Sequence, residues 1–321
     1  MNQSSQLRPI SFDDFIGQKT LKNTLRSMIN SAKHQNKQMP HILLYGLPGM
    51  GKTTLASLIA YEMGSDIHFV QGANLEKKSD IINMLSIIKE GDIIFVDEIH
   101  SINKQIVEFL YNAMEDFVFD LIVGAEGNSK SVRMKIKPFT LIGATTKLNE
   151  IAQPFKDRFG YLARLSNYTE QELSEIINNS SKKLNINIED KYINIISLYS
   201  RKTPRIANHL LQRINDFAIS ENNGVINNKI LKITFKNLGL FEYGLTRDHI
   251  EYLEILKEGF EDKYVSLLTI SGILSQTKEN ILSEIEPILQ YFKLIEKSSK
   301  GRRISSKGID YLLRQNFQSF K

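Results

Sequence analysis

The residues with the clearest chemical meaning form a phosphate loop. Residues Gly46 to Thr53 read Gly-Leu-Pro-Gly-Met-Gly-Lys-Thr, which matches the pattern G-x-x-x-x-G-K-T. The glycines let the backbone curl so that successive N–H groups and a helix N-terminus face a polyphosphate. Lys52 is then expected to reach the β- and γ-phosphates, and the Thr53 hydroxyl to bind Mg²⁺. The segment therefore predicts a site for ATP or a related nucleoside triphosphate.

A second set of candidate catalytic residues ends an apolar run. Asp92 to Val96 reads as a buried strand, and Asp97 and Glu98 follow it directly. Acids at the carboxyl end of a parallel strand lie at the edge of the sheet where ligands bind. Asp97 is suited to Mg²⁺ and Glu98 to polarising the attacking water, so the pair predicts hydrolysis rather than binding alone.

Three further polar features follow the acidic pair along the chain. A strand ends at Thr145 and Thr146, and either hydroxyl could face the γ-phosphate. Arg158 lies on a loop after that strand, and Arg205 starts a later helix. In this order after a phosphate loop, these residues resemble an AAA+ ATPase. The resemblance implies that Arg158 acts on the nucleotide of a neighbouring subunit, so that hydrolysis requires a ring.

The elements that must hold these residues alternate between strand and helix. Strand patterns cover His41–Tyr45 and Phe139–Gly143, and helix patterns cover Thr54–Ala60 and Lys104–Met114. This alternation predicts an α/β fold with a mostly parallel sheet and helices on both faces. We expect this large ATPase domain to span residues 1–167.

The next region, residues 168–238, is helical in pattern and is expected to be a small lid domain. Thr169 and Glu172 form a capping box at the start of one helix. A later helix starts at Pro204 and carries Ile206, Leu210, Ile214 and Phe217 along one stripe.

Residues 239–321 read as three helices followed by a basic hairpin. The helix patterns begin near Ile250, at Ser266 and at Lys278, and short strand candidates cover 293–297 and 303–305. The segment 293–321 contains eight bases and two acids, a net charge of +6, whereas 239–292 has a net charge of −6. This arrangement predicts a winged-helix domain with a phosphate-facing surface. Some such domains bind proteins instead of DNA.

Composition limits the remaining possibilities. The chain has 321 residues, 41% hydrophobic residues, 24% charged residues and a formal net charge of +5. It has no cysteine, which excludes disulfides and thiolate metal sites and fits a cytoplasmic protein. No apolar run is long enough to span a bilayer, and the polar N-terminus does not resemble a signal peptide. We therefore expect no membrane association.

Nearly the whole chain resembles the RuvB family, the bacterial AAA+ motors of Holliday junction branch migration. The generic nucleotide motifs contribute, but two segments are much more specific: Ala113 to Asp116 and Thr203 to Asn208. The remaining matching stretches are 7–9, 15–18, 43–55, 75–77, 96–100, 111–117, 138–146, 154–160 and 300–302. The resemblance implies a homohexameric ring that drives duplex DNA arms through the junction during recombination and repair.

The resemblance also implies roles for individual positions. Lys52, Asp97, Glu98 and Arg158 would be catalytic, with Thr53 and Asp97 at Mg²⁺. The nucleotide-binding positions would be Leu7, Arg8, Gly49, Lys52, Thr53, Thr54, Glu115, Asp116, Phe117, Arg158, Tyr168 and Arg205. The DNA-binding positions would be Lys278, Lys297 and Arg302.

The partners follow from the same resemblance. The segment Leu121 to Lys137 matches a β-hairpin that docks on the junction-binding protein RuvA, and a RuvC-type resolvase would be a further partner where one is present. The hairpin tip, 126–130, is more polar than is usual in the family. Lysine at two of the three DNA positions keeps the charge but not the bidentate fork, which suffices for phosphates read without sequence preference.

Two other classes of protein remain open. A clamp-loader subunit shares the AAA+ domain and lid but is expected to end in a helical collar. It also usually carries Ser-Arg-Cys where this chain has Lys156, Asp157 and Arg158. An initiator-like switch that uses ATP only for assembly would tolerate the loss of Glu98.

Overall fold

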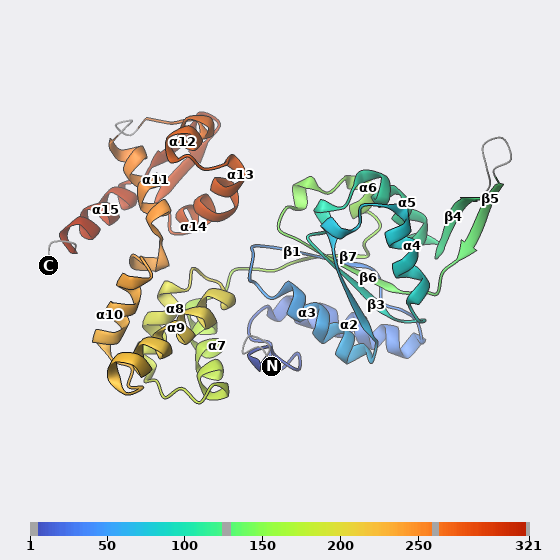
Figure 1. Cartoon of the computed structure of the whole chain (residues 1–321), viewed down its shortest axis with the longest axis horizontal. Coiled ribbons are helices and arrows are strands. Elements are labelled where there is room, and N and C mark those ends of the chain that lie inside the picture. Colours follow the sequence, from blue (N-terminus) through green and yellow to red (C-terminus); the bar gives the residue numbers. More distant parts are fainter. Residues whose placement is uncertain (1–5, 124–129, 259–262, 319–321) are drawn as a thin grey trace. The chain divides into compact units, whose positions relative to one another are not determined.

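The structure, a computed structural model, describes residues 6–123, 130–258 and 263–318. The chain divides into two compact units, Met1–Tyr168 and Thr169–Lys321 (Figure 1). Within the described ranges, no helix is both long and apolar enough to cross a membrane.

The first unit is built on five parallel strands in the order β2-β3-β6-β1-β7. The strands are β1 (Ile42–Tyr45), β2 (Ile67–Gln71), β3 (Ile93–Asp97), β6 (Thr140–Thr145) and β7 (Tyr161–Arg164). The central strands β1, β3 and β6 are buried along almost their whole length, as expected for strands covered on both faces. These three agree with the strand patterns in the sequence. The edge strands β2 and β7 are only partly buried, and no such pattern marks them.

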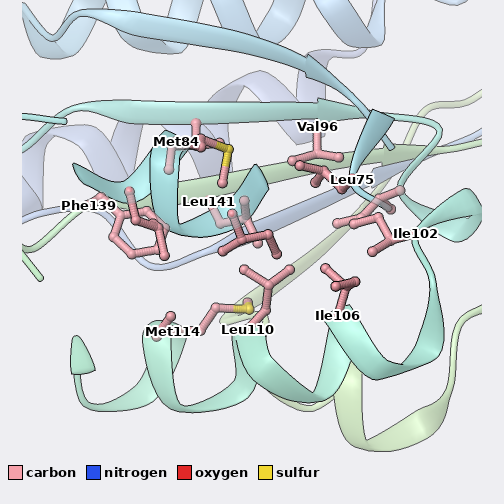
Figure 2. Close-up of a cluster of buried hydrophobic side chains, with 14 of the residues drawn as sticks. Leu75, Met84, Val96, Ile102, Ile106, Leu110, Met114, Phe139 and Leu141 are labelled. Atoms are coloured by element: carbon pink, nitrogen blue, oxygen red, sulfur yellow. The ribbon is translucent and has the colours of Figure 1, made fainter. Parts of the chain in front are cut away.

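Helices cover the sheet on both sides (Figure 1). They are α2 (Lys19–Gln35), α3 (Lys52–Met63), α4 (Lys78–Ile87), α5 (Lys104–Glu115) and α6 (Gln153–Lys156), with short 3₁₀ turns η1 (Gly72–Asn74), η2 (Ile99–Ser101) and η3 (Leu148–Glu150). Leu110 of α5 packs with Val96 of β3 and Leu141 of β6 in one buried cluster (Figure 2). This packing holds β3 and β6, whose carboxyl ends carry polar residues, in place against α5.

A two-stranded antiparallel hairpin extends from this unit (Figure 1). It consists of β4 (Val118–Val123) and β5 (Lys130–Lys135), with Phe119 opposite Met134 and Asp120 opposite Arg133. A hairpin was expected over residues 121–137, and it begins a few residues earlier. The polar tip at 126–129 lies outside the described residues.

The second unit starts with four helices. They are α7 (Glu170–Lys183), α8 (Asp190–Tyr199), α9 (Pro204–Asn222) and α10 (Asn228–Asn237), followed by the turn η4 (Glu242–Gly244). The predicted capping box is present, because the Glu172 N–H donates to Thr169 Oγ1 and the Thr169 N–H donates to Glu172 Oε2. On α9, Leu210 and Ile214 are buried as expected, whereas Ile206 and Phe217 are only partly buried.

The rest of the unit is a helical group with a two-stranded wing. Its elements are α11 (Arg247–Glu258), α12 (Leu267–Leu274), α13 (Lys278–Asn280), η5 (Ile281–Ile285), α14 (Glu286–Tyr291), β8 (Ile295–Ser298), β9 (Gly301–Ile304) and α15 (Ser306–Gln318). The order confirms the predicted helices and hairpin, and α15 is an additional helix. Elements α13, η5 and α14 form one helix interrupted by a π-turn. Pro287, near the start of α14, has no N–H and so cannot donate the hydrogen bond of a regular α-helix. The π-turn at 281–285 lies just before this proline.

Candidate nucleotide site and basic wing

The phosphate loop joins the end of β1 to the start of α3. Its backbone is left-handed at Gly49 (φ +75°) and Gly51 (φ +99°), a conformation that favours glycine. A Cβ atom at Gly51 would also lie 3.1 Å from the ring of Phe15. Both the curl of the loop and its close contact with Phe15 therefore depend on glycine.

Lys52 is buried within this loop at the N-terminus of α3. Its Nζ donates hydrogen bonds to the carbonyl oxygens of Gly46 (2.8 Å) and Leu47 (3.1 Å). Thr53 and Thr54 follow on the first turn of α3, where helix N–H groups lack partners inside the helix. The loop therefore presents an ammonium group and helix N–H groups together, which suits a polyphosphate.

Residues from the N-terminal segment and from the end of the unit pack against the phosphate loop. Tyr168 is buried, and its hydroxyl donates to the carbonyl of Met50 at 3.2 Å. Gln18 makes two hydrogen bonds with the backbone of Ser166, at 2.6 and 2.9 Å. Leu7, which is partly buried, and Arg8, which is exposed, come earlier in the N-terminal segment. The structure thus brings the predicted Tyr168 to the phosphate loop and adds Phe15, which the motifs did not identify as a site residue. Gln18 instead holds the segment that leads to Tyr168.

The acidic pair lies at the same edge of the sheet. Because β3, β6 and β1 are parallel neighbours, their carboxyl ends place Asp97, Thr145 and the phosphate loop at one edge. Asp97 ends β3, and its Oδ1 accepts a hydrogen bond from the Glu98 N–H at 3.1 Å. Glu98 has a left-handed backbone (φ +48°), which turns the chain sharply at the end of the strand.

The Glu98 carboxylate is held by the neighbouring strand end. Its Oε2 accepts a hydrogen bond from Thr146 Oγ1 at 3.3 Å and lies 3.1 Å from His100 Nδ1. Thr145 is fully buried, and its Oγ1 lies 3.0 Å from His100 Nδ1 and accepts from the Lys147 N–H. Of the two threonines, Thr146 is therefore the one whose hydroxyl contacts Glu98. His100 links the two groups, a role that its sequence position did not indicate.

Arg158 lies at the opposite end of the sheet from the phosphate loop, near the amino ends of β1 and β7. It precedes Tyr161, which is paired with Ile42 at the first position of β1. The phosphate loop follows the other end of β1, and a four-residue strand spans roughly 13 Å. Arg158 and the phosphate loop of the same chain are therefore separated by the length of the sheet.

The surroundings of Arg158 fix its guanidinium. Its Nη1 donates to the carbonyl oxygen of Pro154 at 2.7 Å, and its Nη2 lies 3.4 Å from Glu115 Oε2. The guanidinium carbon lies 4.0 Å from the ring centroid of Tyr111, within the range of a cation–π contact. The structure therefore brings together Arg158 and Glu115, two residues predicted to face a nucleotide.

A buried histidine anchors the segment that begins with Glu115. His41 Nε2 donates to the carbonyl of Met114 at 2.9 Å, and His41 Nδ1 accepts from the Leu141 N–H at 2.8 Å. Burial lowers the pKa of His41 despite its hydrogen bond to Met114, so the ring is neutral. Phe117 packs edge-on against His41, with its backbone at φ +53°. These contacts hold the turn at 115–117, with Glu115 and Asp116 exposed.

Arg205 belongs to the second unit. It is exposed on the first turn of α9, directly after Pro204.

The wing brings two of the three predicted DNA-binding residues together. Lys297 on β8 lies directly opposite Arg302 on β9. Both bind the buried carboxylate of Glu286, through Lys297 Nζ (2.9 Å) and Arg302 Nε (2.6 Å). Lys278 is exposed at the start of α13, separate from this cluster.

The bases of the wing have two acidic partners. Glu296, which is adjacent in sequence, pairs with Arg303 at 2.7 Å. Glu286, which lies outside the wing in sequence, pairs with both Lys297 and Arg302. Burial alone would raise the pKa of Glu286, but the hydrogen bonds from Arg302 and Lys297 outweigh it and hold that pKa below its usual value.

The exposed side chains of the β4–β5 hairpin divide between its two faces. Val132 and Met134 occupy alternate positions on β5 and are 45% and 44% exposed. Arg133 lies between them on the other face, where it pairs with Asp120 at 2.9 Å. Val132 and Met134 therefore form an accessible apolar patch on one face, and such patches occur at surfaces that bind other proteins.

Family models match the chain over three consecutive ranges. Residues 7–165 match the P-loop domain of the Holliday junction DNA helicase RuvB, residues 168–240 match the RuvB AAA lid domain, and residues 242–313 match the RuvB C-terminal winged-helix domain.

Similar proteins agree with these matches. A Holliday junction branch migration complex subunit RuvB from Mycoplasmopsis synoviae is 64% identical over 96% of this chain and 98% of its own length. The corresponding subunit from Ureaplasma urealyticum is 41% identical over 97% and 98%. The solved structure of the Thermotoga maritima RuvB branch migration motor superposes with a TM-score of 0.86 at 34% identity, covering 96% of this chain and 98% of that one. With an AAA+ P-loop fold, a helical lid and a winged helix in this order, the chain belongs to the RuvB family.

Proposed function

We propose that this chain is the ATP-dependent motor of Holliday junction branch migration in recombination and DNA repair. In this proposal it acts in the cytoplasm as a homohexameric ring that drives duplex DNA arms through a RuvA-bound junction. The observation that carries the proposal is the position of Arg158, at the edge of the sheet opposite its own phosphate loop. A hydrolysis site with an arginine at the γ-phosphate then needs a neighbouring subunit, which a ring provides.

The residues at the phosphate-loop edge divide the chemistry between them. Lys52 binds the β- and γ-phosphates, and Gly49, Thr53 and Thr54 bind phosphate through the loop and the first turn of α3. Glu98 accepts a hydrogen bond from the attacking water and orients it, while Thr146 holds the Glu98 carboxylate. The Thr53 hydroxyl and the Asp97 carboxylate suit Mg²⁺, which usually keeps few protein ligands and would neutralise charge on the phosphate oxygens.

The remaining nucleotide contacts come from three further places. Leu7 and Arg8, near the N-terminus, and Tyr168, whose hydroxyl contacts the Met50 carbonyl in the phosphate loop, would contact the base and sugar side of the nucleotide. Arg158, with Glu115, Asp116 and Phe117, would face the nucleotide of the next subunit. Arg205 would act as a second sensor from the lid.

We assign the large ATPase domain to residues 1–167, the lid to 168–238 and the DNA-binding domain to 239–321.

The wing favours this function over a clamp loader. A clamp loader is expected to end in a helical collar, whereas here β8 and β9 follow α14 and carry bases. An assembly switch would not need Glu98 to be held by Thr146 and His100. The proposal is tested by incubating the protein with ATP, Mg²⁺, RuvA and a synthetic four-way junction. We expect duplex products that depend on hydrolysis, and an intact junction would reject the proposal.

Exposed wing and helix lysines should contact duplex phosphates without reading sequence. Lys278 and Lys300 are both exposed and lie outside the Glu286 cluster. Replacing both by alanine should lower the magnitude of the log–log salt slope of duplex binding by about 2, because each phosphate contact releases counterions. All duplex sequences should weaken alike, as measured by fluorescence anisotropy. Replacing Lys232 and Lys236 on α10 removes the same charge and should leave the slope unchanged; equal slopes for both pairs would reject the contact.

The apolar face of the hairpin should bind RuvA. Replacing Val132 and Met134 by serine should weaken RuvA binding by about tenfold or more. The two apolar side chains, exposed in the isolated chain, would otherwise be buried against RuvA in the complex. Replacing Lys135, on the opposite face, should change binding little. Titration of immobilised RuvA measures both effects, and equal affinities for all variants would place the interface elsewhere.

A RuvC-type resolvase, where present, would join the same complex.

A further inference from the structure

Glu286 is a buried carboxylate at the centre of the winged-helix domain. Its side chain is 2% exposed and accepts hydrogen bonds from three groups. These are the Tyr252 hydroxyl (3.0 Å), Lys297 Nζ (2.9 Å) and Arg302 Nε (2.6 Å). A carboxylate in this position must be paired, because an isolated buried charge is very unfavourable.

The helix that carries Glu286 places it in the core. The π-turn at 281–285 ends with the Glu286 N–H bonded to the carbonyl of Ile281, five residues back. Ile285, Glu286 and Leu289 are all buried, so Glu286 lies on the buried side of its helix. The irregular helix thus directs Glu286 towards the inner side of the wing.

The two cations that Glu286 binds would otherwise repel each other. Lys297 and Arg302 are directly opposite on antiparallel strands, where like charges destabilise a sheet. The backbone of Arg302 is also fixed by two hydrogen bonds with Val265, at 2.7 and 2.8 Å. With both the backbone and the guanidinium Nε held, the side chain of Arg302 has one preferred direction.

The solvent exposure of the three side chains indicates whether the ion pairs of Glu286 with Lys297 and Arg302 persist when DNA binds. Arg302 is 12% exposed and its partner Glu286 is 2% exposed, whereas Lys297 is 40% exposed. Withdrawing Arg302 towards a phosphate would leave a buried carboxylate with a lost partner, which costs far more than an exposed ionic contact returns. Arg302 therefore keeps its Nε on Glu286 and can offer its Nη groups to a phosphate. Lys297 can use its other N–H groups in the same way.

We propose that Glu286 is a positioning residue for DNA binding: it orients Lys297 and Arg302 so that both meet duplex phosphates from one fixed surface. This inference rests on the proposed function, since it deepens the role given there to the wing. Fixing the two side chains in advance lowers the conformational entropy lost when they bind phosphate. The carboxylate itself does not contact DNA.

The test compares Glu286→Gln with the parent protein in duplex binding over a range of salt concentrations. Glutamine keeps a similar shape and an acceptor but lacks the charge that holds both cations. We expect affinity to fall about tenfold and the magnitude of the salt slope to fall by about 1 to 2, as if one or both contacts were lost. In the Lys297→Ala/Arg302→Ala background, the same substitution should have no further effect on binding.

Two controls separate positioning from folding. Tyr252→Phe removes one hydrogen bond to Glu286 but neither ion pair, and it should leave affinity within about twofold. Circular dichroism and thermal melting establish the folded fraction of each variant, and Glu286→Asp provides a second variant, with reduced affinity, if Glu286→Gln does not fold. ATP turnover without DNA should be the same in Tyr252→Phe and in the parent protein.

The possible outcomes are distinct. If folded Glu286→Gln binds DNA as tightly as the parent or more tightly, Glu286 only balances charge and the inference is wrong. If Lys297→Ala/Arg302→Ala itself binds DNA with the parent's affinity and salt slope, the DNA-binding role of the wing is wrong instead.

Discussion

Replacing Arg158 by alanine should leave ATP binding intact and lower ATP turnover by roughly 10³-fold or more. The arginine lies at the sheet edge opposite its own phosphate loop, beside Glu115 and Tyr111. In the proposed ring it would not hold ATP in its own subunit and would instead stabilise the transition-state charge in the next one. Steady-state hydrolysis and equilibrium binding of a fluorescent ATP analogue separate the two effects.

Variants of Tyr111 provide a graded control for this result. Tyr111→Phe keeps a ring beside the guanidinium and should retain most of the turnover. Tyr111→Leu removes the cation–π contact and should lower kcat with little change in KM, by a smaller factor than Arg158→Ala. If Arg158→Ala instead abolished ATP binding while turnover per bound ATP was normal, the arginine would act within its own site.

The second large effect concerns the phosphate-loop edge. Lys52→Ala should abolish hydrolysis and weaken nucleotide binding, because a buried cation opposite the phosphates is lost. Glu98→Gln should abolish hydrolysis but leave ATP bound, because the role proposed for this side chain is to orient water rather than phosphate. Rings of the Glu98→Gln variant should therefore persist on DNA in ATP. Nucleotide binding and electron microscopy of the DNA complexes measure the two outcomes.

Thr146→Val is a matched control for Glu98. It removes the hydroxyl that bonds Glu98 Oε2, keeps the shape of the side chain, and should slow hydrolysis without affecting ATP binding. Equal loss of nucleotide binding in the Lys52 and Glu98 variants would contradict the division of roles between these two residues.

Local backbone requirements explain why the phosphate loop and the strand that ends in Asp97 could be predicted from sequence. The phosphate loop needs glycine at positions with a left-handed backbone, and a buried parallel strand needs an unbroken apolar run before its terminal acids. Both requirements appear as short patterns of adjacent residues. The central strands, the capping box of α7 and the winged-helix order were predicted for the same reason.

The features that were missed depend on contacts between distant residues. Glu286 is 11 residues from Lys297 and 16 from Arg302, and only the packing of α14 against the wing brings them together. His100 reaches Thr145 across two adjacent strand ends, 45 residues apart. The edge strands β2 and β7 are partly exposed, so they lack the apolar run that marks a central strand.

The proposed ring requires each hydrolysis site to be completed by the neighbouring subunit. We claim that mixing Arg158→Ala with Lys52→Ala protein restores ATP turnover on duplex DNA, measured at several ratios. Each variant alone should be nearly inactive. Equal mixing should restore up to about a quarter of the parent rate, because random rings then pair an intact phosphate loop with an intact arginine at one interface in four. No recovery at any ratio, with mixed rings shown to form, would contradict the claim.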